Sequence, residues 1–285
     1  MSILKKIDKE NMNKDANENK VIKKINLNLI LRYLIAFIII IPIIYFFMWM
    51  ITKSLPFPNI LPKQISIDGF LYFFSPSTNS LSIIIYSIVL SLCVSVICIG
   101  LSIPSAKAIA CYDFKGKELF KIIILSPIIL PTLSIAMGVH IFFIKLKIAN
   151  TFLGVLLIQI IPCIPYSFKI FLDVYEIIKD KMDIQARVLG ASKLYILRKV
   201  TIPILADSII SAASMVFIVS FGQYFITFLI GGGRIYTYSI VMFPFLQNAN
   251  RNVSAVYSLF FTIICLIVLF FIDKSLKLKY KKRFL

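Results

Sequence analysis

Charged residues are scarce in this 285-residue sequence. They make up 15% of it, against about 25% in typical soluble domains. The hydrophobic share is 59%, and the mean hydropathy is +0.91. This composition excludes a water-soluble globular enzyme and indicates an integral membrane protein.

Residues that catalyse reactions or bind metals are also scarce. The only histidine is His140, and four of the five cysteines lie in long apolar runs. No phosphate-binding loop of the form Gly-x-x-x-x-Gly-Lys-Ser/Thr occurs, and no apolar run contains a pair of carboxylates. We therefore expect no catalytic residue, no metal site and no cofactor on this chain.

What the sequence does contain is long apolar runs. A helix needs about 20 apolar residues to cross the hydrocarbon core of a bilayer, and runs of this length exclude the short strands of a transmembrane barrel. We predict an all-α protein with a second span that ends at Pro104 and a third that contains Pro127 and Pro131. The six predicted spans are residues 33–51, 81–103, 122–144, 152–171, 207–221 and 254–272.

The basic residues predict how these helices are oriented. With both termini placed in the cytosol, internal segments hold 24 of the 31 Lys and Arg residues and external loops hold 6. The positive-inside rule therefore favours an N-in, C-in, multi-pass protein of the cell membrane. We expect residues 1–30 to form a basic, disordered cytosolic leader and residues 31–285 to form the transmembrane domain. Nucleic-acid binding is not expected, because no basic folded domain remains.

The loop at residues 172–203 is more than a simple connector. Asp183 is predicted to cap a first short helix, and Gly190 to end it. Ser192 is predicted to cap a second helix, which Pro203 ends. Two amphipathic helices hinged at a glycine could lie on lipid headgroups or insert an apolar face into a groove of a soluble partner. The residues alone leave both interpretations open.

Part of this loop carries a family resemblance. Gln185-Ala186, Gly190-Ala191-Ser192 and Ile202-Pro203 resemble the "EAA" loop of permease subunits of binding-protein-dependent ABC importers. Ile184 and Gln185 depart from the first two letters of that pattern, whereas the spacing from Gly190 to Pro203 matches it. Residues 220–225, 231–233 and 242–243 resemble the spermidine/putrescine branch most closely.

The resemblance implies a type I ABC importer permease fold and a set of partners. These are an ABC ATPase dimer that carries the ATP and Mg, a second permease subunit (the same chain or a relative) and an extracellular solute-binding protein. A polyamine-like cargo is implied, with an oxyanion, iron(III) or thiamine as alternatives. The residues that would couple to the ATPase are Asp183, Gln185, Ala186, Gly190, Ala191, Ser192 and Pro203.

Prolines and polar residues inside the spans are candidates for the translocation pathway. Prolines free backbone carbonyls, which are tolerated where they face protein or water, but they also bend helices simply for packing. Hydroxyl and amide side chains can line a pathway or bond neighbouring helices together. The candidates are Pro127, Pro131, Pro162, Pro165, Ser214, Ser220 and Gln223.

Two other classes of function compete with an importer subunit. A self-contained secondary carrier or channel would be expected to show intramembrane charges or an internal repeat, and neither is evident in the sequence. A membrane-embedded enzyme would need a polar catalytic set inside the spans, and none is present. The importer subunit is therefore the favoured prediction, and the carrier or channel is the alternative.

Overall fold

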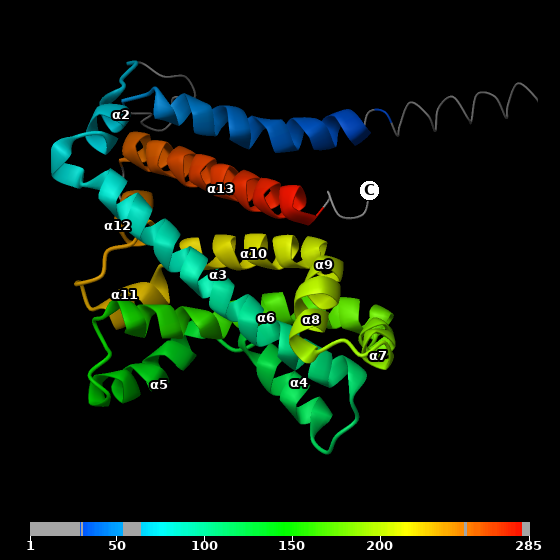
Figure 1. Ribbon diagram of the computed structural model, residues 1–285. Coiled ribbons are helices and arrows are strands. Elements are labelled where there is room, and N and C mark those ends of the chain that lie inside the picture. Colours follow the sequence, from blue (N-terminus) through cyan, green and yellow to red (C-terminus); the bar gives the residue numbers. More distant parts are fainter. Residues whose placement is uncertain (1–28, 30, 54–63, 248–249, 281–285) are drawn as a thin grey trace, which may run out of the picture. The chain divides into compact units, whose positions relative to one another are not determined.

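The computed structural model describes residues 29, 31–53, 64–247 and 250–280, and within them the regular structure is helical (Figure 1). Of the predicted leader 1–30, only Leu29 is described. The elements are α2 (Asp68–Phe73), η1 (Pro76–Thr78), α3 (Ser80–Cys111), α4 (Lys117–Leu125), η2 (Ser126–Ile128), α5 (Thr132–Lys145), α6 (Phe152–Ile178), α7 (Lys181–Val188), α8 (Lys193–Ile196), η3 (Leu197–Thr201), α9 (Ile202–Ile204), α10 (Ala206–Phe221), α11 (Phe225–Gly231), α12 (Tyr238–Gln247) and α13 (Arg251–Tyr280).

The chain divides into two compact units, Met1–Asp68 and Gly69–Leu285. The first contains the helix Leu31–Met50, which is apolar and long enough to span a membrane. This helix ends in a turn in which the Thr52 hydroxyl donates to the Met48 carbonyl over 2.6 Å. The core and the candidate functional site both belong to the second unit.

The structure contains four to six candidate spans, and the predicted six is the upper end of that range. By length and composition, four described helices could cross a membrane: Leu31–Met50, Pro76–Cys111, Phe152–Ile178 and Arg251–Ser275. Two bent pairs bring the total to six if each pair is one span. These pairs are Lys117–Ile128 with Thr132–Lys145, bent by 102°, and Lys193–Ile204 with Ala206–Phe221, bent by 73°.

The prediction that the second span ends at Pro104 is wrong, because α3 continues through this residue to Cys111. Proline removes one backbone donor and strains the preceding turn. The residues beyond it, however, keep packing into the interior: Ala106 and Ile109 are buried against Phe168 and Leu172 of α6. This burial outweighs the local cost, and the helix extends two turns further than predicted.

The third predicted span, residues 122–144, is sharply bent at its prolines. The chain bends by 102° between η2, which contains Pro127, and α5, for which Pro131 is the N-cap. Proline disfavours the helical conformation of the residue before it, and two prolines four residues apart end one helix and start another. No described residue of α4 or η2 is buried in this chain, so packing does not restore the helix as it does at Pro104.

The core lies where α3, α6 and α10 pack together (Figure 1). Its apolar part includes Val94, Ile158 and Val216, one from each helix. Hydroxyls fasten the helices further: Ser102 of α3 and Ser167 of α6 are buried with their oxygens 2.5 Å apart. Such small polar contacts allow close approach of helices that lack a hydrophobic driving force in lipid.

Candidate functional site

Residues 181–204, here named the elbow, connect α6 to α10 and contain the predicted coupling loop. Its first helix, α7, ends where the sequence predicts, with Gly190 in the left-handed region at φ +81°. The Gly190 amide donates to the Arg187 carbonyl over 2.9 Å, and the Ala191 amide donates to the Ala186 carbonyl over 3.0 Å. This pair of bonds is the Schellman motif, for which glycine is the preferred residue.

The second half of the elbow begins as predicted but ends differently. The Ser192 hydroxyl accepts from the Tyr195 amide over 3.3 Å, which caps α8. A π-helical turn at Leu197–Thr201 then leads into α9. Pro203 does not end the helix as predicted, because it lies in the first turn of α9, where no backbone donor is required. The bend comes two residues later, at Leu205.

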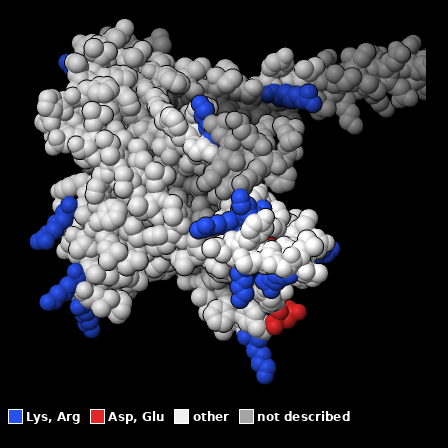
Figure 2. Space-filling model, viewed as in Figure 1, with Lys and Arg blue, Asp and Glu red and all other residues white. Residues whose placement is uncertain are grey.

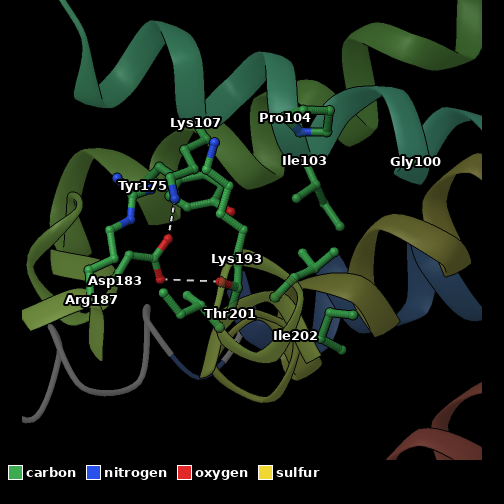
Figure 3. A pocket seen from close by; sticks show the side chains of 12 residues that line it. Gly100, Ile103, Pro104, Lys107, Tyr175, Asp183, Arg187, Lys193, Thr201 and Ile202 are labelled. Atoms are coloured by element: carbon green, nitrogen blue, oxygen red, sulfur yellow. Dashed lines mark hydrogen bonds and ion pairs between the residues drawn. The ribbon is translucent and has the colours of Figure 1, made fainter. Parts of the chain in front are cut away.

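Asp183 does not cap α7, which corrects the predicted role. Asp180 occupies the N-cap position, and Asp183 lies in the first turn with its side chain turned toward α3. There it pairs with the ammonium of Lys107 and accepts from the Thr201 hydroxyl over 3.2 Å (Figure 3). Asp183 therefore joins both halves of the elbow to the end of a long spanning helix.

Lys107 is the residue that sequence reasoning missed. Its Nζ also lies 2.9 Å from Oδ1 of Asp180, whose Oδ2 accepts from the Tyr112 hydroxyl over 3.2 Å. One cation thus holds two carboxylates at the start of the elbow. A signal existed, because Lys107 is the only charged residue in α3, but no spacing rule connects it to partners more than 70 residues away.

This ion pair is maintained at neutral pH. Burial alone would raise the pKa of Asp180, but the hydrogen bond and charge of Lys107 outweigh burial and lower it below its ordinary value of 3.8. A lowered folded-state pKa gives stability that is present above the ordinary value and is lost as pH falls through the folded-state value. The pairing of Lys107 with Asp180 therefore weakens as the pH falls into the acid range.

The outer surface of the elbow is apolar and basic. Ile184, Val188 and Leu189 are 52%, 82% and 86% exposed, and Leu194 is 57% exposed. Basic side chains surround this surface, as Figure 2 shows; the exposed ones on the elbow are Lys181, Arg187, Lys193, Arg198 and Lys199. Of the other predicted coupling residues, Gln185 and Ser192 are exposed, and Ala186 and Ala191 are partly buried.

The predicted pathway prolines occupy two different environments. Pro162 and Pro165 are buried inside the continuous helix α6. Pro127 is partly buried and Pro131 is exposed, both at the bend between α4 and α5. Two of the four prolines thus lie inside the packed helix α6, and the other two lie at the bend before α5. The structure does not gather them around a single cavity.

The predicted polar residues of α10 also separate. Ser214 and Gln223 are partly buried. Ser220 is 2% exposed and donates to Gln159 Oε1 over 2.5 Å, while Gln159 Nε2 donates to Thr227 over 2.7 Å. Gln159, which sequence analysis did not single out, thus bonds α6 to both α10 and α11. For Ser220, the alternative of bonding helices together fits this geometry.

Replacing Gln159 with leucine is expected to destabilise the fold by about 1–2 kcal/mol. The substitution leaves the buried hydroxyls of Ser220 and Thr227 without their partner, and an unsatisfied buried polar group costs roughly 1–3 kcal/mol, partly relieved by bonds to the helix backbone. The free energy of unfolding in mixed micelles measures the effect. Ser211→Ala is the control, because among the described residues this exposed hydroxyl on α10 bonds only to the Asp207 carbonyl. Equal losses for both variants would contradict the assignment.

The fold and the elbow together define a multi-pass helical membrane protein with a helix–glycine–helix projection braced against its spans. Residues 99–278, which include the whole elbow, match the family model described as "Binding-protein-dependent transport system inner membrane component". The chain belongs to this family of inner-membrane permease components, which are not catalytic enzymes.

Three curated relatives match part of the chain. It is 27% identical over 143 residues to the trehalose/maltose transport system permease protein MalG of Thermococcus litoralis and 26% identical over 153 residues to the arabinooligosaccharides transport system permease protein AraQ of Halalkalibacterium halodurans. It is 29% identical over 113 residues to the molybdate/tungstate transport system permease protein WtpB of Pyrococcus abyssi. These matches cover 50%, 53% and 40% of this chain and 51%, 54% and 45% of the relatives, so the chain spans about half the length of each.

A solved structure extends the similarity to most of the fold. The chain superimposes with a TM-score of 0.66 and 18% identity on a chain of a bacterial ABC transporter involved in the import of the acidic polysaccharide alginate. The match covers 87% of this chain and 94% of the other. The type I importer permease fold predicted from the sequence is therefore confirmed.

Proposed function

We propose that this chain is the membrane-spanning subunit of an ATP-driven importer, in which the elbow docks on a separate ATPase. The observation that carries the proposal is the row of exposed apolar side chains on a helix pair that ion pairs of Lys107 connect to α3. An apolar helix face fits a groove of a soluble partner, and a rigid contact can pass a partner's motion to the spans. An ATPase dimer with ATP and Mg, a second permease and an extracellular binding protein complete the proposed assembly.

We propose a carbohydrate as the cargo, in place of the polyamine implied by the sequence resemblance. Two of the three relatives are named for sugar transport and none for polyamine transport. In the sequence, α3, α5, α11 and α12 contain no Asp or Glu, and a multiply charged cation crossing between such helices lacks counter-charges.

Aromatic side chains near the end of α10 support an uncharged, ring-shaped cargo. Tyr224 stacks on Phe243 with ring centroids 3.7 Å apart. Phe225 and Phe228 are 53% and 52% exposed beside this stack. Ligand sites are typically lined by aromatic side chains with a few polar groups, and the partly buried Gln223 is the nearest such group in sequence.

Cargo identity is tested by ATP hydrolysis of the assembled importer in vesicles. We expect maltotriose or an arabinooligosaccharide, with the binding protein, to stimulate hydrolysis at least about threefold and to be taken up, whereas spermidine has no effect. Molybdate is the second candidate, because one relative is named for its transport, and it is assayed in parallel. Stimulation by spermidine alone would overturn the cargo proposal, and uptake by the chain without any ATPase would instead support a secondary carrier.

A further inference from the structure

A cavity of about 500 Å³ lies between the elbow and the end of α3 (Figure 3). One wall is apolar and is formed by Ile103, Pro104, Ile196, Leu197 and Ile202. The other side carries polar groups from four helices and the π-helical turn: Lys107, Tyr175, Asp183, Arg187, Lys193 and Thr201. A cavity of this size matches the sites that bind small molecules.

Tyr175 indicates that the cavity is built to hold a ligand. This side chain borders the cavity and is only 4% exposed. Its hydroxyl is buried and has no hydrogen-bond partner in the described part of the chain. Buried polar groups are nearly always satisfied, so the hydroxyl is available to a molecule that occupies the cavity.

The charges around the cavity select an anion. Lys107 is compensated, because it pairs with Asp180 and Asp183. Arg187 and Lys193 are exposed and take part in none of the ion pairs between described residues. Arg187 also acts on Asp180, whose pKa it helps to lower. Lys107, Arg187 and Lys193 still exceed the two carboxylates by one positive charge, and this excess borders the same space as Tyr175.

We propose that this cavity binds an amphipathic anion with a phosphate head and an apolar body. Arg187 and Lys193 neutralise the phosphate head, and the Tyr175 hydroxyl donates a hydrogen bond to one of the phosphate oxygens. Hydrogen bonds to an ionised phosphate are charge-assisted and therefore strong. The apolar body covers Ile196 and its neighbours. Two sources supply this chemistry: an anionic phospholipid of the adjacent leaflet, and a soluble phosphorylated metabolite.

A bound anion bridges the elbow to Tyr175 of α6, beside the Lys107 ion pairs. It therefore stabilises one position of the elbow relative to the spans. An influence on ATPase coupling rests on the proposed function, whereas binding itself is measured on the chain alone. Failure of the importer proposal thus leaves the binding proposal testable.

The experiment measures binding to the full chain in an uncharged detergent by native mass spectrometry. The probes are dihexanoyl phosphatidylglycerol, dihexanoyl phosphatidylcholine, hexyl phosphate and inorganic phosphate. We expect one saturable site for phosphatidylglycerol, with affinity at least tenfold higher than for the choline lipid or for inorganic phosphate. If hexyl phosphate displaces phosphatidylglycerol completely, the natural ligand is the soluble phosphorylated metabolite. If hexyl phosphate does not displace it, the natural ligand is the phospholipid. Equal binding of all four probes, or no binding, overturns the proposal.

Variants locate the site. Gly100→Leu fills the cavity, because a Cβ at this cavity-lining position meets nothing within 4 Å, and it should abolish binding without disturbing the fold. Arg187→Gln with Lys193→Gln is expected to weaken binding at least tenfold, and Tyr175→Phe about fivefold. The matched control is Arg198→Gln with Lys199→Gln, two basic residues of the elbow that do not line the cavity. Unchanged binding by the Gly100 variant, or equal losses in the control, contradicts the assignment.

Discussion

Replacing Gly190 with arginine is expected to reduce cargo-stimulated ATP hydrolysis and uptake by the assembled importer more than tenfold, while the chain still inserts. Gly190 lies at φ +81°, a conformation that costs a residue with a side chain about 1–2 kcal/mol. The new side chain also projects from the hinge between the two exposed apolar helices, where the ATPase is proposed to dock. Measuring both activities alongside the amount of inserted chain separates coupling from folding.

Gly116→Arg is the matched control for this prediction. Gly116 also has a positive φ, of +88°, and a Cβ there meets only the Phe120 ring at 4.0 Å. The same substitution therefore imposes a similar backbone cost in a loop that lies outside the elbow. Normal transport by the Gly190 variant contradicts the docking proposal, and an equal loss in the Gly116 variant attributes the effect to destabilisation instead.

The helical class and the apolar spans can be predicted from the sequence, but the ends of the helices and the short helices α11 and α12 cannot. Apolar length alone predicts six spans, because the hydrocarbon thickness sets that length. The prolines show why ends fail. Pro104 lies within a helix and Pro131 starts one, although both are prolines inside apolar runs. The difference lies in the packing of the residues beyond each proline, since Ala106 and Ile109 are buried against α6, and sequence spacing does not reveal that tertiary contact.

The elbow shows the same division between local and tertiary information. The roles of Gly190 and Ser192 depend on backbone bonds within a few residues, and the sequence predicts both correctly. The role of Asp183 depends on Lys107, which lies 76 residues earlier in the chain. Local sequence rules therefore misassign Asp183 as a cap, and they treat Lys107 only as a contributor to topology.

The resemblance to the polyamine branch rests in part on residues that the structure places in the core. Ser220 is bonded to Gln159, and Phe221 is 2% exposed among aromatic side chains. Buried residues are constrained by packing and do not report which solute passes. Buried residues of such a motif therefore indicate the fold of the family, whereas the cargo must be inferred from the exposed side chains nearby.

Replacing Lys107 with methionine is expected to reduce coupled transport at least tenfold and to loosen the elbow. Methionine fills a similar volume but leaves the carboxylates of Asp180 and Asp183, whose side chains are 14% and 11% exposed, without their cation. Removing one partner of a fully buried pair costs about 3–5 kcal/mol, and partial exposure reduces this to about 2 kcal/mol. Hydrogen exchange of the amides in α7 measures the loosening, which we expect to be about 30-fold faster.

Lys169→Met is the matched control, because Lys169 pairs with Asp173 at 2.6 Å in an exposed i,i+4 geometry with side chains 55% and 52% exposed. Such pairs contribute less than about 1 kcal/mol, so transport and exchange should stay close to wild type. Asp183→Asn in the Lys107→Met background removes one uncompensated charge and should recover part of the protection of α7. If hydrogen exchange in α7 does not change in the Lys107 variant, the ion pair does not hold the elbow. The mechanical link between α3 and the proposed ATPase contact then has to lie in the apolar packing of Ile196 and its neighbours.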